Sequence, residues 1–512
     1  MAEPRVDSCM PSQPAIIDRL LLALAATLAV YLLVVLFIYG FYDGYLDHGE
    51  AIVTAEAFSV LKGMQVYTPF DGPRFTSNVY GPVLFLANGL MMAVFGGSVA
   101  ASKLAGLLSA VCSVLLVVWA MRAGPRRWCL YAAIAMTSYI LVFVPYSIWN
   151  RPDPLLLVLS CAGLVVIRSQ MTVQRPVLGW IMIGILGGLA CGLKIYGPLF
   201  LMPFGVYLAL RHKSLVSVLV MSVAGLSVAF LPFVLQVFPL DNYLSWFGIF
   251  AKKPTIGAMA GKALRYGMFY LIPPIALIVH QFNIRKSLLK TFQDPDFGYT
   301  LSAIIGISGC IYLASKPGAG MYYVLPFAPI AIDMMVRLGT DENSSRLYTK
   351  RISQVLWLVI VAAMLVASVP IQKRNFKALE WDRTSAIKAD LHTIMRKYND
   401  KKIQMGVGNT IGGYHNTLQK TELILAGNPY SVDFGIMMET SFLKIPLPKA
   451  LIETISSCQT DIWLIPRHEA PFEIIGYYGN KVVDDSFINA FKGAYALTGS
   501  SEYFDIWACK SR

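Results

Sequence analysis

The stretch Tyr80–Gly97, YGPVLFLANGLMMAVFGG, decides how this very apolar chain is threaded through a membrane. Asn88 and Gly89 lie at its centre, and a Gly-Pro and a Gly-Gly pair lie near its two ends. These residues weaken it as a lipid-facing helix, because polar groups and helix breakers are costly in hydrocarbon. If the stretch spans the membrane, the chain has twelve spans. If it lies at the interface, the chain has eleven, and every later segment changes sides.

The composition of the whole chain is that of a polytopic membrane protein. Of the 512 residues, 56% are hydrophobic and 14% are charged, whereas a soluble protein has about 45–50% and about 25%. These values exclude an ordinary cytosolic enzyme, a disordered chain and a collagen-like chain. The net charge of +13 does not indicate a nucleic-acid partner, because the basic residues form short runs between apolar segments and no continuous basic face.

The predicted spans follow from the length rule, because a membrane helix needs about 20 apolar residues, with a range of about 17–25. Clear candidates are 20–42, 99–121, 128–149, 214–237, 266–284, 298–315 and 353–370. Shorter candidates are 154–167, 177–193, 195–210 and 321–336. No small-residue cleavage site follows the first candidate, so we expect a membrane anchor and no removed signal peptide.

The positive charges choose between eleven and twelve spans. Suppose that residues 1–19 lie in the cytoplasm and that 80–97 does not cross the membrane. All the basic clusters between spans then fall on the cytoplasmic side. The clusters are Arg122, Arg126 and Arg127; Arg168 and Arg175; Arg211 and Lys213; Arg285, Lys286 and Lys290; and Arg337, Arg346, Lys350 and Arg351. If 80–97 spans, all of them move outside. The positive-inside bias therefore predicts eleven spans within residues 20–370 and an interfacial helix in 80–97.

This threading places the outer loop 43–97 and the whole tail 371–512 outside the cytoplasm. The tail has ordinary polarity, a helical pattern near 383–398, a helix-like stretch at 449–457, and β-rich runs at 403–407, 461–465 and 503–508. We expect a small extracytoplasmic α/β domain of ordinary size. Cys458 and Cys509 are the only two cysteines in this region, and they can pair if it faces an oxidising compartment.

Ionisable residues gather where spans meet the outer face, and each is a candidate functional residue because such groups are costly near hydrocarbon. The densest cluster follows the first span and contains Asp47, His48 and Glu50, which lead into an amphipathic segment. A carboxylate at this place can meet a lipid head group at the interface. The alternative is a hydrated loop whose acids only face water.

Two further clusters lie at the outer ends of later spans. Arg151 and Asp153 flank Pro152 in a turn, and they are either functional groups or a structural ion pair. Lys194 ends a short glycine-rich span, where a lysine either binds an anion or extends its side chain to the interface.

The last cluster comes late in the membrane region. Lys316 is followed by Tyr322 and Tyr323, and Tyr80 lies at the same outer level. Tyrosines at this depth form either an aromatic belt or a binding site. Lys252, Lys253, Lys262 and Arg265 also make the loop 238–265 basic. A basic loop attracts lipid phosphate or faces anionic head groups.

The order of these features resembles the GT-C membrane glycosyltransferases, in the family 39-like group of the protein O-mannosyltransferases and the aminoarabinose transferase. The resemblance covers roughly residues 20–340. It rests on the acidic stretch 47–50, an amphipathic segment and the helix ending at Gly97, then Arg151-Pro152-Asp153, the glycine-rich span ending at Lys194, and the stretch 322–326. That family has two adjacent acids, but here His48 stands in the second place. The working carboxylate is therefore either Asp47 or Glu50. The tail from 371 resembles no family.

The resemblance implies a multi-pass enzyme of a bacterial inner membrane that moves a sugar from a polyprenyl-phosphate carrier to an acceptor hydroxyl on a glycan, lipid or protein. Asp47 is then the general base, and Arg151, Lys194 or Lys316 balances the leaving phosphate. Asp153 orients a substrate or joins Asp47 in holding a divalent cation, a candidate cofactor that two carboxylates do not establish. His48, Tyr80, Tyr322 and Tyr323 are candidate substrate-binding residues.

Two other functions are compatible with the chain. A transporter or flippase of lipid-linked glycans predicts repeated halves and ionisable residues at mid-span. No repeat is visible in the sequence, and Asp333 is the one acid well inside an apolar run. A polymerase or ligase of surface glycans would share the lipid-linked donor, but its large outer loop comes late in the chain, whereas here the large loop comes first.

Overall fold

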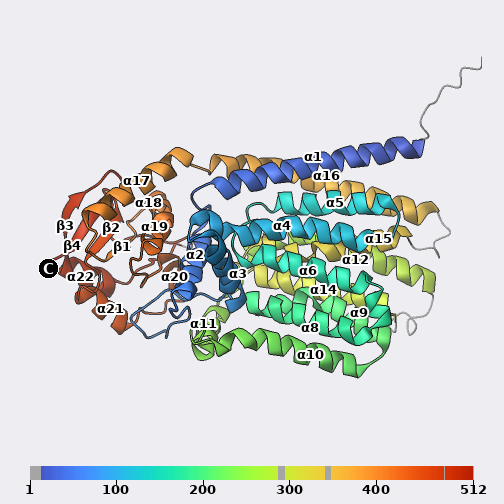
Figure 1. Cartoon of the computed structure of the whole chain (residues 1–512), viewed down its shortest axis with the longest axis horizontal. Coiled ribbons are helices and arrows are strands. Elements are labelled where there is room, and N and C mark those ends of the chain that lie inside the picture. Colours follow the sequence, from blue (N-terminus) through green and yellow to red (C-terminus); the bar gives the residue numbers. More distant parts are fainter. Residues whose placement is uncertain (1–12, 286–293, 341–346, 478, 511–512) are drawn as a thin grey trace, which may run out of the picture.

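The computed structural model describes residues 13–285, 294–340, 347–477 and 479–510. Figure 1 shows a bundle of long helices that run along the molecule, with a smaller domain of helices and strands at one end. Two short helices, α2 (His48–Leu61) and α3 (Pro82–Phe95), lie between the bundle and this domain. The basic residues predicted at positions 286, 290 and 346 lie outside the described residues, and the side chains of 285 and 350 are likewise not described.

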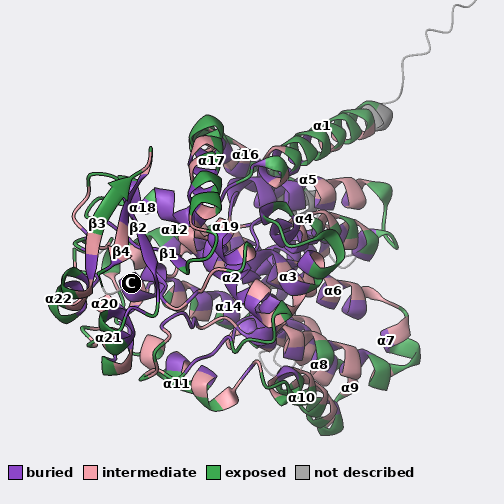
Figure 2. Cartoon of the chain, turned by 60° about the vertical axis from the view of Figure 1, so that its left-hand side comes forward, coloured by how far each residue is buried: buried purple, intermediate pink, exposed green. Residues whose placement is uncertain are grey.

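Eight helical segments in the described chain are long and apolar enough to cross a membrane. They are α1 (Gln13–Phe41), α4 (Val99–Met121), α8 (Pro176–Leu193), α10 (Leu215–Phe230) with η2 (Leu231–Val234), α12 (Gly257–Arg285), α14 (Pro295–Ala314), η3 (Met321–Phe327) with α15 (Ala328–Thr340), and α16 (Leu347–Lys377). Helices α1 and α10 are largely exposed in Figure 2, as helices in contact with lipid should be. The predicted multi-pass α-helical fold is therefore confirmed.

The other three predicted spans form shorter helices inside the same bundle. They are α5 (Arg126–Val142), α6 (Pro152–Arg168) and α9 (Met202–His212), which follows η1 (Gly197–Phe200). Helices α5 and α6 have 17 residues each, at the lower limit of about 17 for a span. Both pack against α4, and α9 packs against α14.

The stretch 80–97 forms the 14-residue helix α3, which at about 1.5 Å per residue is too short for a bilayer core of about 30 Å. Gly96 ends it with φ of 89°, a conformation that suits glycine. Helix α3 packs on α2. Helix α2 begins at a capping box. The Asp47 side chain accepts the backbone N–H of Glu50, and the Glu50 side chain accepts the backbone N–H of Asp47.

The tail forms a small α/β domain around one sheet, as predicted. Strands β1 (Ile403–Met405), β2 (Ile462–Pro466), β4 (Phe504–Cys509) and β3 (Tyr495–Ser500) follow one another across the sheet in that order. Strands β1 and β2 are parallel, and the other two pairings are antiparallel. Cys458 and Cys509 form a disulfide.

Helices surround this sheet. They are α17 (Trp381–Lys397), α18 (Ile411–Asn416), α19 (Lys420–Leu425), α20 (Phe434–Ser441), α21 (Lys449–Ser456) and α22 (Asp485–Ala494). The first of them, α17, lies where the sequence predicts a helix near 383–398.

The tail domain is attached to the outer loop by direct pairing. Phe75 donates its N–H to the Ser431 carbonyl at 2.7 Å, and its own carbonyl accepts the N–H of Asp433 at 2.9 Å. Lys388 on α17 pairs with Asp43 at 2.6 Å and with Glu422 at 2.7 Å. These contacts hold helix α20 over α2, which places residues of the tail beside Asp47 and His48.

Candidate active site

A cavity of about 480 Å³ lies where the outer ends of the helices meet the tail domain. Eight of the ten residues predicted from the sequence line it: Asp47, His48, Tyr80, Arg151, Lys194, Lys316, Tyr322 and Tyr323. They come from five stretches of the chain, at 47–48, 80, 151, 194 and 316–323. The two exceptions, Glu50 and Asp153, lie directly behind the cavity wall and contact residues that line it.

Asp47 faces the cavity from the N-terminus of α2. Its Oδ1 accepts the Gly49 N–H at 2.8 Å and the Arg151 Nη1–H at 2.8 Å, while its Oδ2 lies 4.0 Å from Nδ1 of His48. Burial disfavours the charge, but the positive potential of His48 and Arg151 and the Gly49 hydrogen bond outweigh it and lower the pKa of Asp47. Asp47 is therefore an ionised carboxylate with one oxygen available to a ligand.

Glu50 does not line the cavity. It is fully buried, and its Oε2 accepts the N–H groups of Leu46 at 2.9 Å and Asp47 at 3.2 Å. Burial raises the pKa of Glu50 to about 7, although Lys103 favours its charged form. Lys103 donates to the carbonyls of Tyr39 and Tyr42 at the end of α1. The geometry therefore separates the two candidate carboxylates: Asp47 faces the cavity, and Glu50 holds the turn that carries Asp47.

Arg151 and Asp153 do not pair with each other, although they are two residues apart. Arg151 caps α6 ahead of Pro152 and donates to Asp47 and, at 2.9 Å, to the Tyr322 hydroxyl. Its guanidinium lies 4.0 Å from the centre of the Trp149 ring. Asp153 points the other way and accepts from Lys194 at 2.8 Å.

Lys194 lies at the base of the cavity, within about 6 Å of several aromatic rings. Its Nζ is 4.1 Å from the centre of the Tyr323 ring and 5.8 Å from that of Tyr80. Tyr80 reaches this place because Gly81 donates its N–H to the Leu193 carbonyl at 3.0 Å, and a Cβ at Gly81 would collide with backbone. The second oxygen of Asp153 has no hydrogen-bond partner among the described residues.

Lys316 differs from the other cations that line the cavity. Its Nζ donates to the Ala251 carbonyl at 3.0 Å, and among the described residues no carboxylate pairs with it. Arg151, Lys194 and Lys253 each pair with one. Lys316 therefore has a positive charge that an anionic ligand can use.

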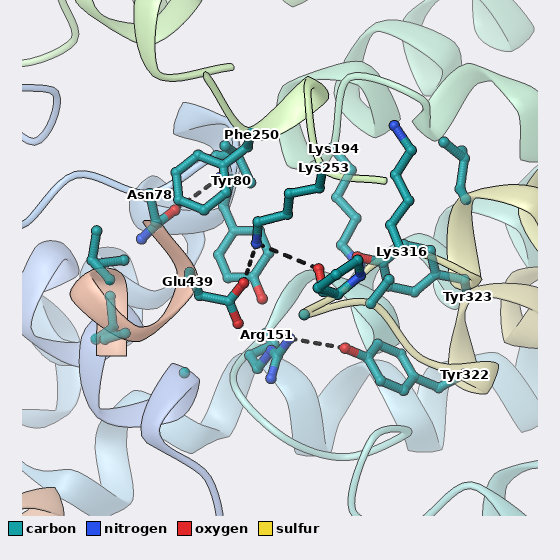
Figure 3. A pocket seen from close by; sticks show the side chains of 18 of the residues that line it. Asn78, Tyr80, Arg151, Lys194, Phe250, Lys253, Lys316, Tyr322, Tyr323 and Glu439 are labelled. Atoms are coloured by element: carbon teal, nitrogen blue, oxygen red, sulfur yellow. Dashed lines mark hydrogen bonds and ion pairs between the residues drawn. The ribbon is translucent and has the colours of Figure 1, made fainter. Parts of the chain in front are cut away.

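Three residues that sequence reasoning did not connect with the site also line the cavity. Lys253 at the end of α11 (Leu240–Ala251) forms an ion pair with Glu439 on α20, and Figure 3 shows this pair across the cavity from Lys316 and Tyr323. The basic character of the loop 238–265 was visible in the sequence, but nothing there indicates Glu439. Tyr477, also from the tail domain, lines the same side.

The residues do not offer a metal site. Among the described residues, no group of three or more His, Cys, Asp or Glu side chains could hold a metal ion. Asp47 and Asp153, the pair suggested by the sequence, are bound to different cations, Arg151 and Lys194. We therefore derive no step through a divalent cation.

The fold is similar to that of two membrane proteins of known structure. No protein-family model and no curated protein sequence matches the chain. The structure of ArnT from Cupriavidus metallidurans bound to undecaprenyl phosphate is 14% identical, with a TM-score of 0.52 over 94% of this chain and 97% of that one. The apo oligosaccharyltransferase of Archaeoglobus fulgidus is 10% identical, with a TM-score of 0.55 over 94% and 74% of the two chains.

A second archaeal structure, AglB from the same organism in complex with an inhibitory peptide and a dolichol-phosphate, is 11% identical, with a TM-score of 0.50 over 95% and 74% of the two chains. At these identities the likeness concerns the fold. The chain has a GT-C-like fold, as the sequence predicted.

Proposed function

We propose that this protein is a membrane glycosyltransferase that moves a sugar from a polyprenyl-phosphate carrier to an acceptor hydroxyl. The observation that supports this most strongly is the convergence of eight predicted residues from distant segments on one cavity. The GT-C-like fold adds support, because its structural neighbours are crystallised with undecaprenyl phosphate and dolichol-phosphate. The order of motifs along the chain favours the family 39-like branch.

In the proposed step, the acceptor oxygen attacks the anomeric carbon of the donor sugar. A new C–O bond forms, the bond from that carbon to the phosphate oxygen breaks, and the polyprenyl phosphate leaves with the electron pair. Asp47 accepts the hydroxyl proton through its free oxygen, because it is ionised and faces the cavity. A positioned base of this kind contributes typically about 10²–10⁴-fold to the rate.

The leaving phosphate needs fixed positive charge and no strong acid. We assign the phosphate to Lys316, which has no carboxylate partner in the described part of the chain, with the more deeply buried Lys194 behind it. Four cations line the cavity, Arg151, Lys194, Lys253 and Lys316, against two carboxylates, Asp47 and Glu439. The excess of positive charge favours an anionic donor, and cations held in place before reaction stabilise the charge that develops on the phosphate.

We also propose that the cavity and the tail domain face away from the cytoplasm, in the inner membrane of a bacterium. Two observations support this orientation. The positive-inside bias favours it, and the Cys458–Cys509 disulfide is of the kind that persists outside the reducing cytosol.

The test is transfer of radiolabel from synthetic polyprenyl-phosphate sugars to acceptors in purified outer-leaflet extract, catalysed by the protein in lipid nanodiscs. Asp47→Asn is the informative variant, because asparagine caps a helix as well as aspartate does but cannot accept the proton. We expect transfer by the wild type and a loss of about 10²–10⁴-fold in the variant. Transfer by Asp47→Asn at the wild-type rate would reject Asp47 as the base, and uptake without any transfer product would indicate a transporter.

A further inference from the structure

The side of the cavity formed by α2 and the tail domain differs in chemistry from the opposite side. Figure 3 shows Lys194, Lys316, Tyr322 and Tyr323 on one side and Glu439 entering from the other. The second side is lined by His48, Ile52, Ile436, Glu439 and Tyr477, and Asp47 lies at its base. Both carboxylates are already paired across the cavity, Asp47 with Arg151 and Glu439 with Lys253. Among the described residues that form this side there is no lysine or arginine, so it offers phosphate no cation of its own.

Tyr477 places an exposed aromatic ring at the mouth of the cavity. A backbone bridge between Ile475 and Lys481 holds the segment that carries it, and Gly476 donates its N–H to the Asn480 carbonyl at 2.8 Å. The ring is nearly parallel to that of His48, with centroids 6.1 Å apart and an interplanar angle of 23°. It lines the cavity and remains 52% exposed, so the ring can contact a bound ligand.

His48 is itself held in place. It lies 6.1 Å from the Tyr414 ring, and its ring packs so closely on Gly435 that a Cβ there would lie 2.7 Å from Cδ2. Gly435 lies in the first turn of α20, the helix that carries Ile436 and Glu439. The His48 ring and the Glu439 carboxylate are therefore positioned relative to Asp47 by the packing of α20 on α2.

We propose that this side of the cavity binds the acceptor and that the acceptor is a neutral carbohydrate, an inference that rests on the proposed function. A sugar ring presents C–H groups on its face, which pack on an aromatic ring with its negative quadrupole. Its rim presents hydroxyls, which donate to carboxylates in charge-assisted hydrogen bonds. Tyr477 offers the first contact, and Glu439 and Asp47 offer the second. A hydroxyl bound this way lies beside the proposed base.

Other acceptor classes fit this wall less well. A phosphorylated lipid or glycan would have to compete with Asp47 and Glu439 for Arg151 and Lys253, the cations that these carboxylates already bind. A peptide bound as an added strand would need an open backbone edge, but the 431–433 segment beside the cavity is already paired with Phe75. A sugar needs neither a cation nor a strand edge.

The experiment uses the full-length protein in nanodiscs with two readouts. The first is binding of radiolabelled undecaprenyl phosphate, which reports the donor side. The second is transfer of label from polyprenyl-phosphate hexose to three kinds of probe: neutral gluco- and manno-oligosaccharides of two to six residues, serine- and threonine-containing peptides, and phosphorylated glycolipids. Variants are Tyr477→Ala and Tyr477→Phe, with Leu497→Ala as the control, because Leu497 on β3 is similarly exposed at 53%.

We expect label on a neutral oligosaccharide. Tyr477→Ala should raise the KM for that acceptor about tenfold, as loss of one stacking contact does, with the affinity for undecaprenyl phosphate unchanged. Tyr477→Phe keeps the ring and should restore the wild-type KM, and Leu497→Ala should have no effect. Label on peptides or phosphorylated glycolipids alone, or an unchanged acceptor KM in Tyr477→Ala, overturns this inference. Failure to bind undecaprenyl phosphate at all overturns the proposed function instead.

Discussion

Helix α6 carries a buried charge cluster at each of its ends, and the two clusters differ in what they leave unpaired. At its C-terminal end Asp333 is fully buried and binds two arginines, with Nε of Arg168 and Nε of Arg337 each at 2.7 Å, one on each carboxylate oxygen. Arg337 also pairs with Asp296. At the other end, about 25 Å away along the helix, Asp47 and Asp153 each keep one oxygen that makes no hydrogen bond to the described chain.

In this molecule a functional cluster and a structural one are distinguished by the groups that remain available to a ligand. Both ends contain Asp and Arg at the ends of apolar helices, so residue type and burial do not separate them. The cavity end has spare hydrogen-bonding oxygens, a cation without a carboxylate partner, aromatic rings and an open volume of about 480 Å³. The Asp333 end has its charges paired within the protein, as expected of a cluster that holds α6, α14 and α15 together.

The largest expected effect is on sugar transfer at the cavity end. Asp47→Asn should reduce kcat by about 10²–10⁴-fold. It should lower thermal stability less than Asp333→Asn does, because asparagine retains the helix cap and the Asp47 side chain is 31% exposed. Asp333→Asn is the matched control and should transfer sugar at the wild-type rate per folded molecule. Equal losses of kcat in the two variants would show that the clusters are not functionally distinct.

The next effect is on stability at the opposite end. Removing the charge of Asp333 leaves two arginines near each other without their common partner, and breaking a buried ion pair in this way costs about 3–5 kcal/mol. Asp333→Asn should therefore unfold at a clearly lower temperature in detergent than either the wild type or Asp47→Asn. A melting temperature equal to that of the wild type would contradict a structural role.

A smaller effect is expected from the cation without a carboxylate partner. Lys316→Ala should weaken binding of polyprenyl phosphate by about 10- to 100-fold, since a hydrogen bond to a charged group contributes about 1.5–3 kcal/mol. Lys213→Ala, a substitution at the opposite end of the helices, provides the control. Equilibrium binding of radiolabelled undecaprenyl phosphate measures the affinity of both variants and of the wild type. Equal affinities of Lys316→Ala and the wild type would show that Lys316 does not bind the phosphate.

The smallest effect concerns the pH dependence of stability. Burial raises the pKa of Glu50 from 4.5 to about 7, so the folded protein binds this proton more tightly than the unfolded chain does. The stabilising contribution is complete below pH 4.5 and is lost as the pH rises from 4.5 to about 7. Glu50→Gln keeps the capping geometry but cannot titrate, so its melting temperature should fall less across this range. If the melting temperatures of the wild type and Glu50→Gln change with pH in the same way, the pKa of Glu50 is not raised in the folded protein.

Much of the membrane fold could be predicted because it depends on composition and sidedness. The charges around each span predict that 80–97 does not cross, and the same charges predict that Asp47, Arg151, Lys194 and Lys316 lie on one side. The capping box was also visible, since Asp47 and Glu50 are three residues apart ahead of an apolar helix. Recognising it would have assigned Glu50 to the turn before the structure was known.

Residues contributed by the tail could not be predicted in the same way. Glu439 and Tyr477 reach the cavity only because Phe75 pairs with the segment 431–433 and because Gly435 lets α20 pack on His48. Such contacts between distant segments leave no periodic pattern in a single sequence. Strand β3 was missed for a local reason, because Thr498, Gly499 and Ser500 are polar or flexible and lie on an exposed edge.

Cross-linking can show directly which end of the bundle binds the lipid phosphate. An undecaprenyl phosphate analogue with a diazirine in its first isoprene unit can be cross-linked to the protein in nanodiscs, and the labelled peptides identified by mass spectrometry. We predict labelling in the segments 247–253 and 313–323, lost on competition with undecaprenyl phosphate and reduced in Lys316→Ala. Labelling around Arg168, Asp296 and Arg337 that is lost on competition with undecaprenyl phosphate would instead show that the lipid phosphate binds at the opposite end of the bundle.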